Sequence, residues 1–497
     1  MRGWKKRIGD FARANSFLVR PFLMVSVIYL VGILAIILVG VHYADDIGRT
    51  ERGYAAWANF SRYINEILSR FVHADNYLTN IAPLPQILAV LILAVTSVML
   101  IYIVVGKDRL KQPWKKWAWL VTAVVPLGLS PYMLECLSYQ YDAIYMALSV
   151  FFVLMPFVFR EGNLKHYLIA VVIGILGTCM TYQAVLGVFP MMIVFLVLND
   201  WSEKKKFAKR TGATLLTFGV VLIVFQKFLM IPRALYVSNS LPSLQDYVPE
   251  TLKHLGQYFD LLINDFKIWW LVIIGVIAVM FVILFIKNSR RNKILAGVVG
   301  VGGLVVMTVC AFVLYASLSA PLFAPRSMYA VGVLLAIICV YVVDNLDGAV
   351  LKIPVFVLSW CFVVFALTYG NALGEQDRYR DMKIDMVMAD LNGLKIMQSE
   401  ETKNIQVVGD VGKSPIIMHM PKDYQMLNRL LSSSYNGGLI WTTYRLVYLC
   451  DIGNLQVDPE LDLTKLDLPV VKSTVYYDIS ADENNVLVRF KEGQGRI

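Results

Sequence analysis

Long, uninterrupted apolar runs dominate the chain from Pro21 to Asn371. Most are about 16 to 22 residues long, and a helix rising about 1.5 Å per residue then crosses a hydrocarbon core roughly 30 Å thick. We therefore expect a mainly α fold, a polytopic membrane helical bundle. The pattern predicts eleven transmembrane helices, at residues 22–41, 87–105, 118–131, 142–159, 167–180, 184–199, 212–231, 268–286, 294–316, 328–343 and 353–370.

Two of the connections between the predicted spans are long, at residues 42–86 and 232–267. Within the first, apolar side chains recur at helical spacing from Tyr54 to Phe71, and a weaker pattern of the same kind runs from Leu252 to Phe266. Such patterns are typical of helices that lie along the membrane interface. The alternative is that both are lids packed on the bundle.

The pattern changes at residue 371, where the long apolar runs end. Residues 371–497 hold 14 Lys and Arg against 18 Asp and Glu, so this part is acidic and water-exposed. Short alternating segments bounded by turn residues predict a small C-terminal α/β domain. Its expected elements are a helix at 377–397 and strands at 404–409, 414–419, 470–477 and 485–490.

Composition supports a membrane protein, since 58% of the residues are hydrophobic and 16% are charged. The net charge of +10 does not indicate nucleic-acid binding, because the cations follow membrane topology. Segments on one side of the predicted spans carry 23 Lys and Arg and those on the other carry eight. The positive-inside rule places the basic N-terminus, residues 1–21, in the cytoplasm and the C-terminal domain outside the cell membrane. No small-residue cleavage site follows the first span, so we expect it to be retained.

The strongest candidate for chemistry is the acidic pair Asp45 and Asp46, followed by Arg49, just beyond the first span. Neighbouring carboxylates near hydrocarbon lose hydration and raise each other's pKa, which suits a general base. The pair has a plainer interpretation, in which it only solvates the helix end. An internal salt bridge to Arg49 or Arg52 is a further alternative.

Topology sends other polar residues to the same outer rim. Tyr141 and Asp142 open the fourth span, where the acid either caps the helix or faces a cavity. Gln183 sits in a tight outer turn and is a candidate for binding a sugar hydroxyl, although a simple turn role competes. Arg326 stands before the tenth span, where guanidinium donors and a helix dipole favour phosphate, unless it is a surface arginine. Arg233 is a second candidate phosphate contact.

The six cysteines and five histidines indicate neither a disulfide framework nor a metal site. Four cysteines fall in or beside apolar runs, which favours a packing role. His42, His73 and His254 lack the spacing of metal ligands. We therefore expect no metal and no cofactor.

The motifs together resemble the membrane-embedded GT-C glycosyltransferases, and within them the serotype-converting glucosyltransferases that modify O-antigen. The resemblance covers about residues 20 to 370 and does not extend to the C-terminal domain. It rests on four segments: Asp45-Asp46-Ile47-Gly48-Arg49, Pro83-Leu84-Pro85-Gln86-Ile87, Tyr139-Gln140-Tyr141-Asp142 and Pro325-Arg326.

The resemblance implies an inverting enzyme that moves one sugar, with glucose expected, from polyprenyl phosphate to a hydroxyl of a surface glycan at the outer leaflet. By resemblance Asp46 or Asp45 is the base, with a preference for Asp46, and the other binds the acceptor or orients Arg49. Arg326 would stabilise the departing phosphate. A polyprenyl-phosphate glycosyltransferase and a flippase are the expected functional partners.

Two other functions compete with the enzyme. A transporter or flippase for a lipid-linked sugar needs no base, but transporters place ionisable groups near the bilayer midplane, often within paired repeats. Here the acids lie at the outer rim, and no internal repeat is evident. A membrane anchor for the C-terminal domain would leave the many spans and both long loops unexplained.

Overall fold

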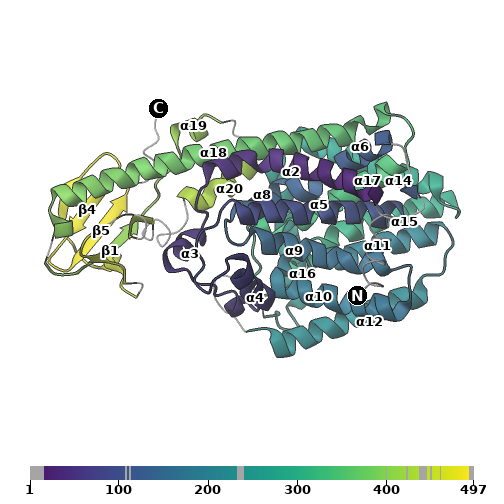
Figure 1. Cartoon of the computed structure of the whole chain (residues 1–497), viewed down its shortest axis with the longest axis horizontal. Helices are drawn as coiled ribbons and strands as arrows, with labels where there is room; N and C mark the ends of the chain where they lie inside the picture. Colours follow the sequence, from purple (N-terminus) through teal and green to yellow (C-terminus); the bar gives the residue numbers. More distant parts are fainter. Residues whose placement is uncertain are drawn as a thin grey trace, which may run out of the picture.

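The structure is a computed structural model of the chain. It describes residues 16–106, 109–110, 114–231, 240–398, 400–420, 424–435, 445–447, 450, 452–458 and 460–491. An elongated helical bundle makes up most of the molecule, and a small sheet lies beyond one end of it (Figure 1).

Eight helices of the described residues are long and apolar enough to cross a membrane, and a bent pair makes a ninth candidate. Two shorter apolar helices, α9 with its 3-10 extension (Ala143–Phe159) and α17 (Ala330–Asp344), lie where the fourth and tenth spans were expected. The eight helices are α2 (Val19–Val39), α5 (Leu84–Val105), α10 (Leu164–Thr181), α11 (Val188–Ser202), α12 (Ala208–Val224) with the π-helix η6 (Phe225–Leu229), α14 (Ile268–Asn288), α15 (Lys293–Cys310) and α18 (Ile353–Gly393).

The bent pair replaces the third predicted span. Helices α6 (Trp114–Ala123) and α7 (Val125–Leu129) run together, and α8 (Pro131–Ser138) then turns away by 59°. The break has a local cause, because Ser130 is extended with ψ 145° and the residue before a proline avoids the helical region. The turn places α8, which is buried throughout, beside the segment that carries Arg326.

The first long loop contains less regular helix than its pattern predicted. The stretch 54–71 is not one interfacial helix: it contains the 3-10 helix η2 (Ala58–Phe60) and then α4 (Tyr63–Val72). Trp57, expected at the interface, is instead fully buried. Its indole N–H donates to Asp142 in the interior. This contact with a distant residue stabilises the observed conformation more than the local pattern favours a regular helix. In the second loop, α13 (Tyr247–Asp265) forms as expected.

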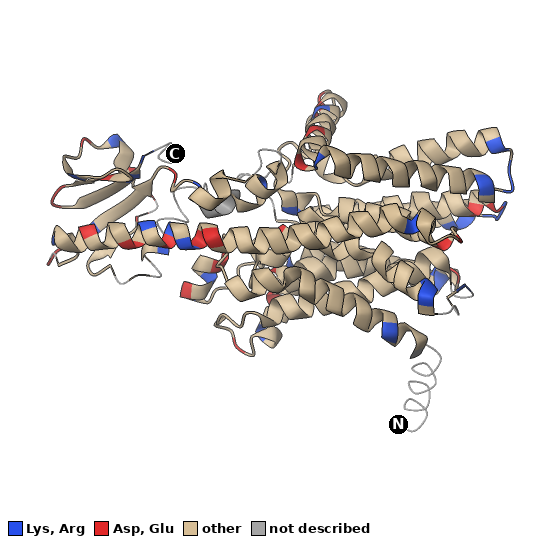
Figure 2. Cartoon of the chain, turned by 90° about the horizontal axis from the view of Figure 1, so that it is seen from above, with Lys and Arg blue, Asp and Glu red and all other residues tan. Residues whose placement is uncertain are grey.

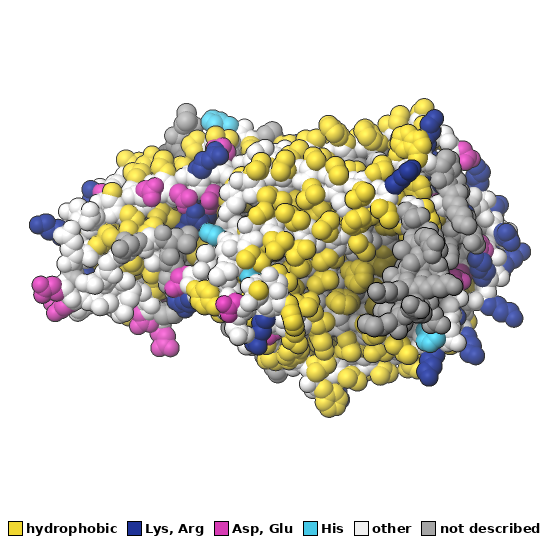
Figure 3. All heavy atoms as spheres, in the orientation of Figure 1, with side chains coloured by type: hydrophobic (Ala, Val, Ile, Leu, Met, Phe, Trp, Pro, Cys, Tyr) yellow, Lys and Arg dark blue, Asp and Glu magenta, His cyan; other side chains and the backbone are white. Residues whose placement is uncertain are grey.

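Charge separates the two ends of the bundle. Basic residues gather at the end remote from the sheet, while acidic ones lie mostly toward the sheet and its connecting helix (Figure 2). Between the ends, the face seen in Figure 3 is covered by hydrophobic side chains. This is the distribution expected of a membrane protein, because an apolar belt meets hydrocarbon and the charged ends meet water.

Helix α18 joins the bundle to the C-terminal part without a break. It runs for 41 residues, so the composition boundary at residue 371 and most of the helix expected at 377–397 lie inside it. Beyond it comes a five-stranded sheet of order β2-β1-β5-β4-β3. Strand β1 pairs in parallel with β2 and β5, and the remaining pairs are antiparallel. The strands are β1 (Lys403–Val408), β2 (Leu455–Gln456), β3 (Val470–Ser473), β4 (Tyr477–Ala481) and β5 (Asn485–Phe490).

Two strand predictions need correction. The segment 414–419 is a helical turn, α19 (Pro415–Met418), because the Ser414 side chain caps it by accepting from the Ile417 N–H and Pro415 occupies the first turn. The segment 470–477 holds β3 and only the first residue of β4, since the chain reverses between them. The strands expected at 404–409 and 485–490 are confirmed as β1 and β5.

The C-terminal part also sends one helix back onto the bundle. Helix α20 (Gln425–Tyr435) packs against α18 and α13, and Leu430 and Leu431 are fully buried there. Arg429 forms an ion pair with the buried Asp265 and donates to the carbonyl of Phe323. The tail is therefore attached to the bundle by apolar and by charged contacts.

Candidate functional site

A cavity of about 770 Å³ opens among the polar residues of the bundle. This volume is typical of small-molecule sites, which span roughly 300 to 1,000 Å³. The start of α3 (Asp46–Arg52), the α8–α9 connection, η5 (Gln183–Val185), α12 with η6, and α16 (Val313–Ala316) all contribute to its wall. Five of the eight predicted site residues line it, namely Asp45, Arg49, Asp142, Gln183 and Arg326.

The adjacent carboxylates have different surroundings. Asp45 lines the cavity, whereas Asp46 is 0% exposed and lies behind the wall. Asp46 Oδ2 accepts the backbone N–H groups of Tyr43 at 3.0 Å and Gln140 at 2.9 Å. Burial raises the pKa of Asp46 well above its usual range. The hydrogen bond from the Gln140 N–H opposes this rise in pKa, and the charge of Asp142 adds to it. Asp46 thus ties two loops together, while Asp45 meets the cavity.

Arg49 pairs with Asp142 in the cavity wall. Asp142 Oδ1 also accepts from the Trp57 indole at 2.5 Å, and the Arg49 guanidinium lies 4.3 Å from the centre of the Trp57 ring. Burial opposes the charged form of Arg49, but the carboxylates of Asp142, Asp45 and Asp46 outweigh it and raise the pKa of Arg49. The salt bridge expected within the loop is therefore wrong for Arg49, whose partner is Asp142 of a distant segment.

Arg326 pairs with Glu135, a residue that sequence reasoning missed. Glu135 Oε1 lies 2.5 Å from the Arg326 guanidinium, and Oε2 accepts the Arg326 backbone N–H at 2.6 Å. Glu135 is 3% exposed, so this carboxylate fixes both the side chain and the backbone of the arginine. The available signal was a lone acid in an otherwise apolar stretch, 131–137, next to a predicted span.

Of the other three predicted residues, two do not line the cavity and one lies outside the described residues. Tyr141 stacks on His73, with ring centres 5.5 Å apart, and does not line the cavity. Asp46 lies behind the wall, and Arg233 falls outside the described residues. Gln183 does line the cavity, and its amide donates to the Phe60 carbonyl at 3.2 Å.

Comparison with known families identifies the chain. Residues 34–337, more than half of the chain, match the family described as glucosyl transferase GtrII. The chain belongs to the GtrII family. This confirms the family predicted from the motifs, and every described residue of the cavity lies inside the matched segment. A glucosyl transferase family favours the enzyme over the transporter and the anchor.

One similar protein shares part of this GtrII chain. It is described as an uncharacterized 55.3 kDa protein in the gtrB 5' region of Salmonella phage P22, and it is 21% identical over 173 residues. The similarity covers 35% of this chain and 34% of that protein, so the chain spans about a third of the relative. No solved structure matches the GtrII chain.

Arg62 lines the cavity of this GtrII protein, and sequence reasoning missed it as it missed Glu135. It lies in the first long loop directly before α4. Its side chain forms no ion pair with a carboxylate of the described residues. Neither its position nor its spacing distinguishes it from Arg52 or Arg70 in the same loop. Only the fold places it in the cavity.

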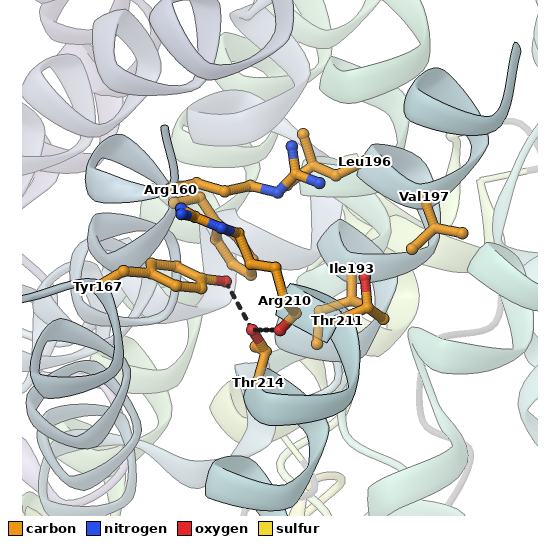
Figure 4. A pocket seen from close by; sticks show the side chains of 9 residues that line it. Arg160, Tyr167, Ile193, Leu196, Val197, Arg210, Thr211 and Thr214 are labelled. Atoms are coloured by element: carbon orange, nitrogen blue, oxygen red, sulfur yellow. Dashed lines mark hydrogen bonds between the residues drawn. The ribbon is translucent and has the colours of Figure 1, made fainter. Parts of the chain in front are cut away.

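A second hollow in the GtrII bundle is too small for a substrate. It measures about 10 Å³, room for about one water molecule, and lies near Arg160, Tyr167 and Arg210 (Figure 4). Arg160 forms an ion pair with Asp200, and the Thr214 hydroxyl lies 3.2 Å from that of Tyr167. We assign it a packing role. Among the described residues, no group of three or more His, Cys, Asp and Glu is placed to hold a metal.

Proposed function

We propose that the protein transfers a single glucose from polyprenyl phosphate to a hydroxyl of a cell-surface polysaccharide, with inversion, at the outer face of the cell membrane. The GtrII family supports a glucosyltransferase. The observation that carries the rest is one cavity in which a carboxylate, arginines and an apolar wall meet.

The two sides of the cavity suit the two parts of such a donor. Asp45, Arg49, Asp142, Gln183 and Arg326 form a polar side, suited to sugar hydroxyls and phosphate. The other side is apolar and suits a polyprenyl chain. It includes Leu222, Phe225, Met230, Leu314, Leu318 and Leu322.

Helix α12 separates this apolar wall from the outside of the bundle. It packs chiefly against α10, and the side chains of Leu216 and Val220, together with Phe228 of η6, are exposed. In a membrane those side chains contact lipid. Helix α12 therefore has one side toward lipid and another at the cavity, which supports a hydrophobic carrier over a soluble sugar nucleotide.

In the proposed reaction, Asp45 is the general base. It takes the proton of the acceptor hydroxyl as that oxygen attacks the anomeric carbon from the face opposite the phosphate. The bond between the anomeric carbon and the phosphate oxygen breaks, and its electron pair leaves with the polyprenyl phosphate. Asp46 acts as a positioning residue, because its hydrogen bonds hold the segment that carries Asp142.

Arg326 stabilises the leaving phosphate in this proposal. Negative charge grows on the phosphate oxygens as the bond breaks, so a fixed guanidinium favours the transition state over the bound substrate. Glu135 supplies the fixed geometry. Arg49, Gln183 and Asp142 bind substrate hydroxyls from the polar wall, and Tyr141 supports that wall from behind. No metal or cofactor takes part.

Topology completes the proposal. The basic end of the bundle faces the cytoplasm with the N-terminus, and the cavity and the C-terminal domain face the exterior. A polyprenyl-phosphate glycosyltransferase would make the donor inside, and a flippase would deliver it to the outer leaflet.

The test is transfer by the purified protein in lipid nanodiscs. Polyprenyl-phosphate glucose should be consumed with a polysaccharide acceptor, while the galactose and N-acetylglucosamine analogues and UDP-glucose should be poor donors. NMR of the product gives the anomeric configuration. Transfer from UDP-glucose alone would overturn the donor assignment, and retained configuration would overturn the mechanism.

A further inference from the structure

Three arginines of the described residues line the cavity, and their partners differ. Arg49 is paired with Asp142 and Arg326 with Glu135, so each of these two charges is largely compensated inside the protein. The side chain of Arg62 forms neither a hydrogen bond nor an ion pair with any described residue, and its Nε is buried without a partner. A buried guanidinium nitrogen that lacks a partner is unusual and points to a missing acceptor.

Aromatic rings hold the Arg62 guanidinium in place. Its Cζ lies 4.4 Å from the centre of the Tyr182 ring and 5.1 Å from that of Phe60. Cation–π contact uses the face of the guanidinium plane, whereas the N–H donors point outward within the plane. The rings therefore fix the group and leave its five donors for an anion.

The backbone places Arg62 where the two sides of the cavity meet. The residues on either side of it both bind the end of the apolar wall: the Ser61 hydroxyl accepts the Ile231 N–H at 2.8 Å, and the Tyr63 hydroxyl donates to the Leu229 carbonyl at 2.7 Å. A phosphate joined to a hydrocarbon chain must sit at such a boundary, with its charge toward the donors and its chain along the wall.

We infer that Arg62 is the main binding group for the phosphate of a lipid monophosphate, and this rests on the proposed function. The uncompensated charge of Arg62 supplies ground-state affinity, and the compensated Arg326 acts mainly when charge develops on the phosphate. Arg62 should therefore govern donor binding, and Arg326 should govern turnover more than binding.

The experiment measures binding of undecaprenyl phosphate and of undecaprenol to the full protein in nanodiscs. Wild type should bind the phosphate more tightly than the alcohol. Arg62→Gln should weaken phosphate binding about 10- to 100-fold, as expected for lost hydrogen bonds to a charged group, and leave alcohol binding unchanged. Arg62→Lys should recover most of the affinity, because Lys retains the charge. Arg70→Gln is the matched control. Arg70 lies in α4, its side chain is exposed, and its guanidinium is 3.8 Å from the Glu66 carboxylate.

Each outcome decides between separate claims. If wild type does not distinguish phosphate from alcohol, the proposed donor class is wrong. If wild type does and Arg62→Gln binds like wild type, Arg62 is not the phosphate site while the donor class stands. If Arg62→Gln and Arg62→Lys both lower the unfolding temperature, and Arg62→Lys does not recover phosphate binding, the residue has a structural role. If an equal concentration of inorganic phosphate displaces undecaprenyl phosphate, the proposal that the ligand is a lipid is wrong.

Discussion

At the scale of single residues, neighbouring identical side chains have different tasks. Asp45 and Asp46 are adjacent, yet only Asp45 lines the cavity. Successive residues at a helix start diverge by about 100°, so one carboxylate faces the cavity while the other is directed into the protein. The Asp46 carboxylate accepts hydrogen bonds from three backbone N–H groups. Tyr43 is near it in the sequence, whereas Gln140 and Tyr141 are distant.

The first prediction separates these two carboxylates. Asp45→Asn should lower kcat by about 10²- to 10⁴-fold through loss of the base, with the unfolding temperature unchanged. Asp46→Asn should instead destabilise the protein by about 1 to 3 kcal/mol, because the amide cannot accept at both oxygens. Turnover assays and thermal unfolding on both variants give the comparison. Full turnover in Asp45→Asn would refute the base assignment.

A second prediction concerns Lys383, near the C-terminal end of α18. Burial lowers the pKa of Lys383 to about 8, against the charge of Asp410. The unfolded chain keeps this proton up to a pH of about 10.4, so unfolding takes up a proton and stability rises as pH increases from about 8 to about 10.

The measurement is the unfolding temperature of wild type and Lys383→Met across that pH range. The variant should lose part of the rise, and other titrating groups cancel in the comparison. Equal slopes would show that Lys383 does not titrate with the lowered pKa.

At the scale of elements, a break in one helix and the docking of another build the site. The break before Pro131 turns α8 so that Glu135 meets Arg326. From the other side, Arg429 of α20 donates to Phe323, three residues before Arg326. The C-terminal part thereby supports the segment that carries a proposed phosphate-binding residue.

The third prediction tests that support. Arg429→Ala leaves the Asp265 carboxylate, 1% exposed, without its cation, which should cost about 3 to 5 kcal/mol of stability. The double variant Arg429→Ala/Asp265→Asn should recover much of this loss, because Tyr132 can still donate to the amide oxygen. Chemical unfolding gives the stabilities, and turnover should fall in the single variant. No coupling between the two substitutions would contradict the role of the pair.

At the scale of the whole molecule, the two ends of the bundle differ in charge and in chemistry. Basic residues mark one end, and the sheet lies beyond the other (Figure 2). The continuous helix α18 fixes the spacing between bundle and sheet, since it has no break at the composition boundary.

The fourth prediction is the orientation of these ends. A cysteine at Ser473, exposed in β3, should react with an impermeant maleimide in intact cells, and one at Lys206 only after the cells are permeabilised. The native cysteines give little background, because five of the six are buried, and Cys450→Ser removes the other. Labelling of position 206 alone in intact cells would place the proposed reaction on the wrong side.

Most of the long apolar helices, the charged ends, the acidic pair and two strands could be predicted from the sequence. They depend on the length of apolar runs, on the count of cations in loops and on local alternation, all of which are properties of neighbouring residues. The same holds for the family, because its motifs are short and contiguous.

Only the tertiary structure decided which charges meet. Asp142 rather than Asp45 pairs with Arg49, Glu135 holds Arg326, and Arg62 stays uncompensated in the cavity. Each of these facts joins segments far apart in the chain, or depends on which way one side chain turns. Hydrophobic patterning places helices in a membrane but does not set their rotation or the partner that a buried charge finds, since packing and pairing with distant residues determine both.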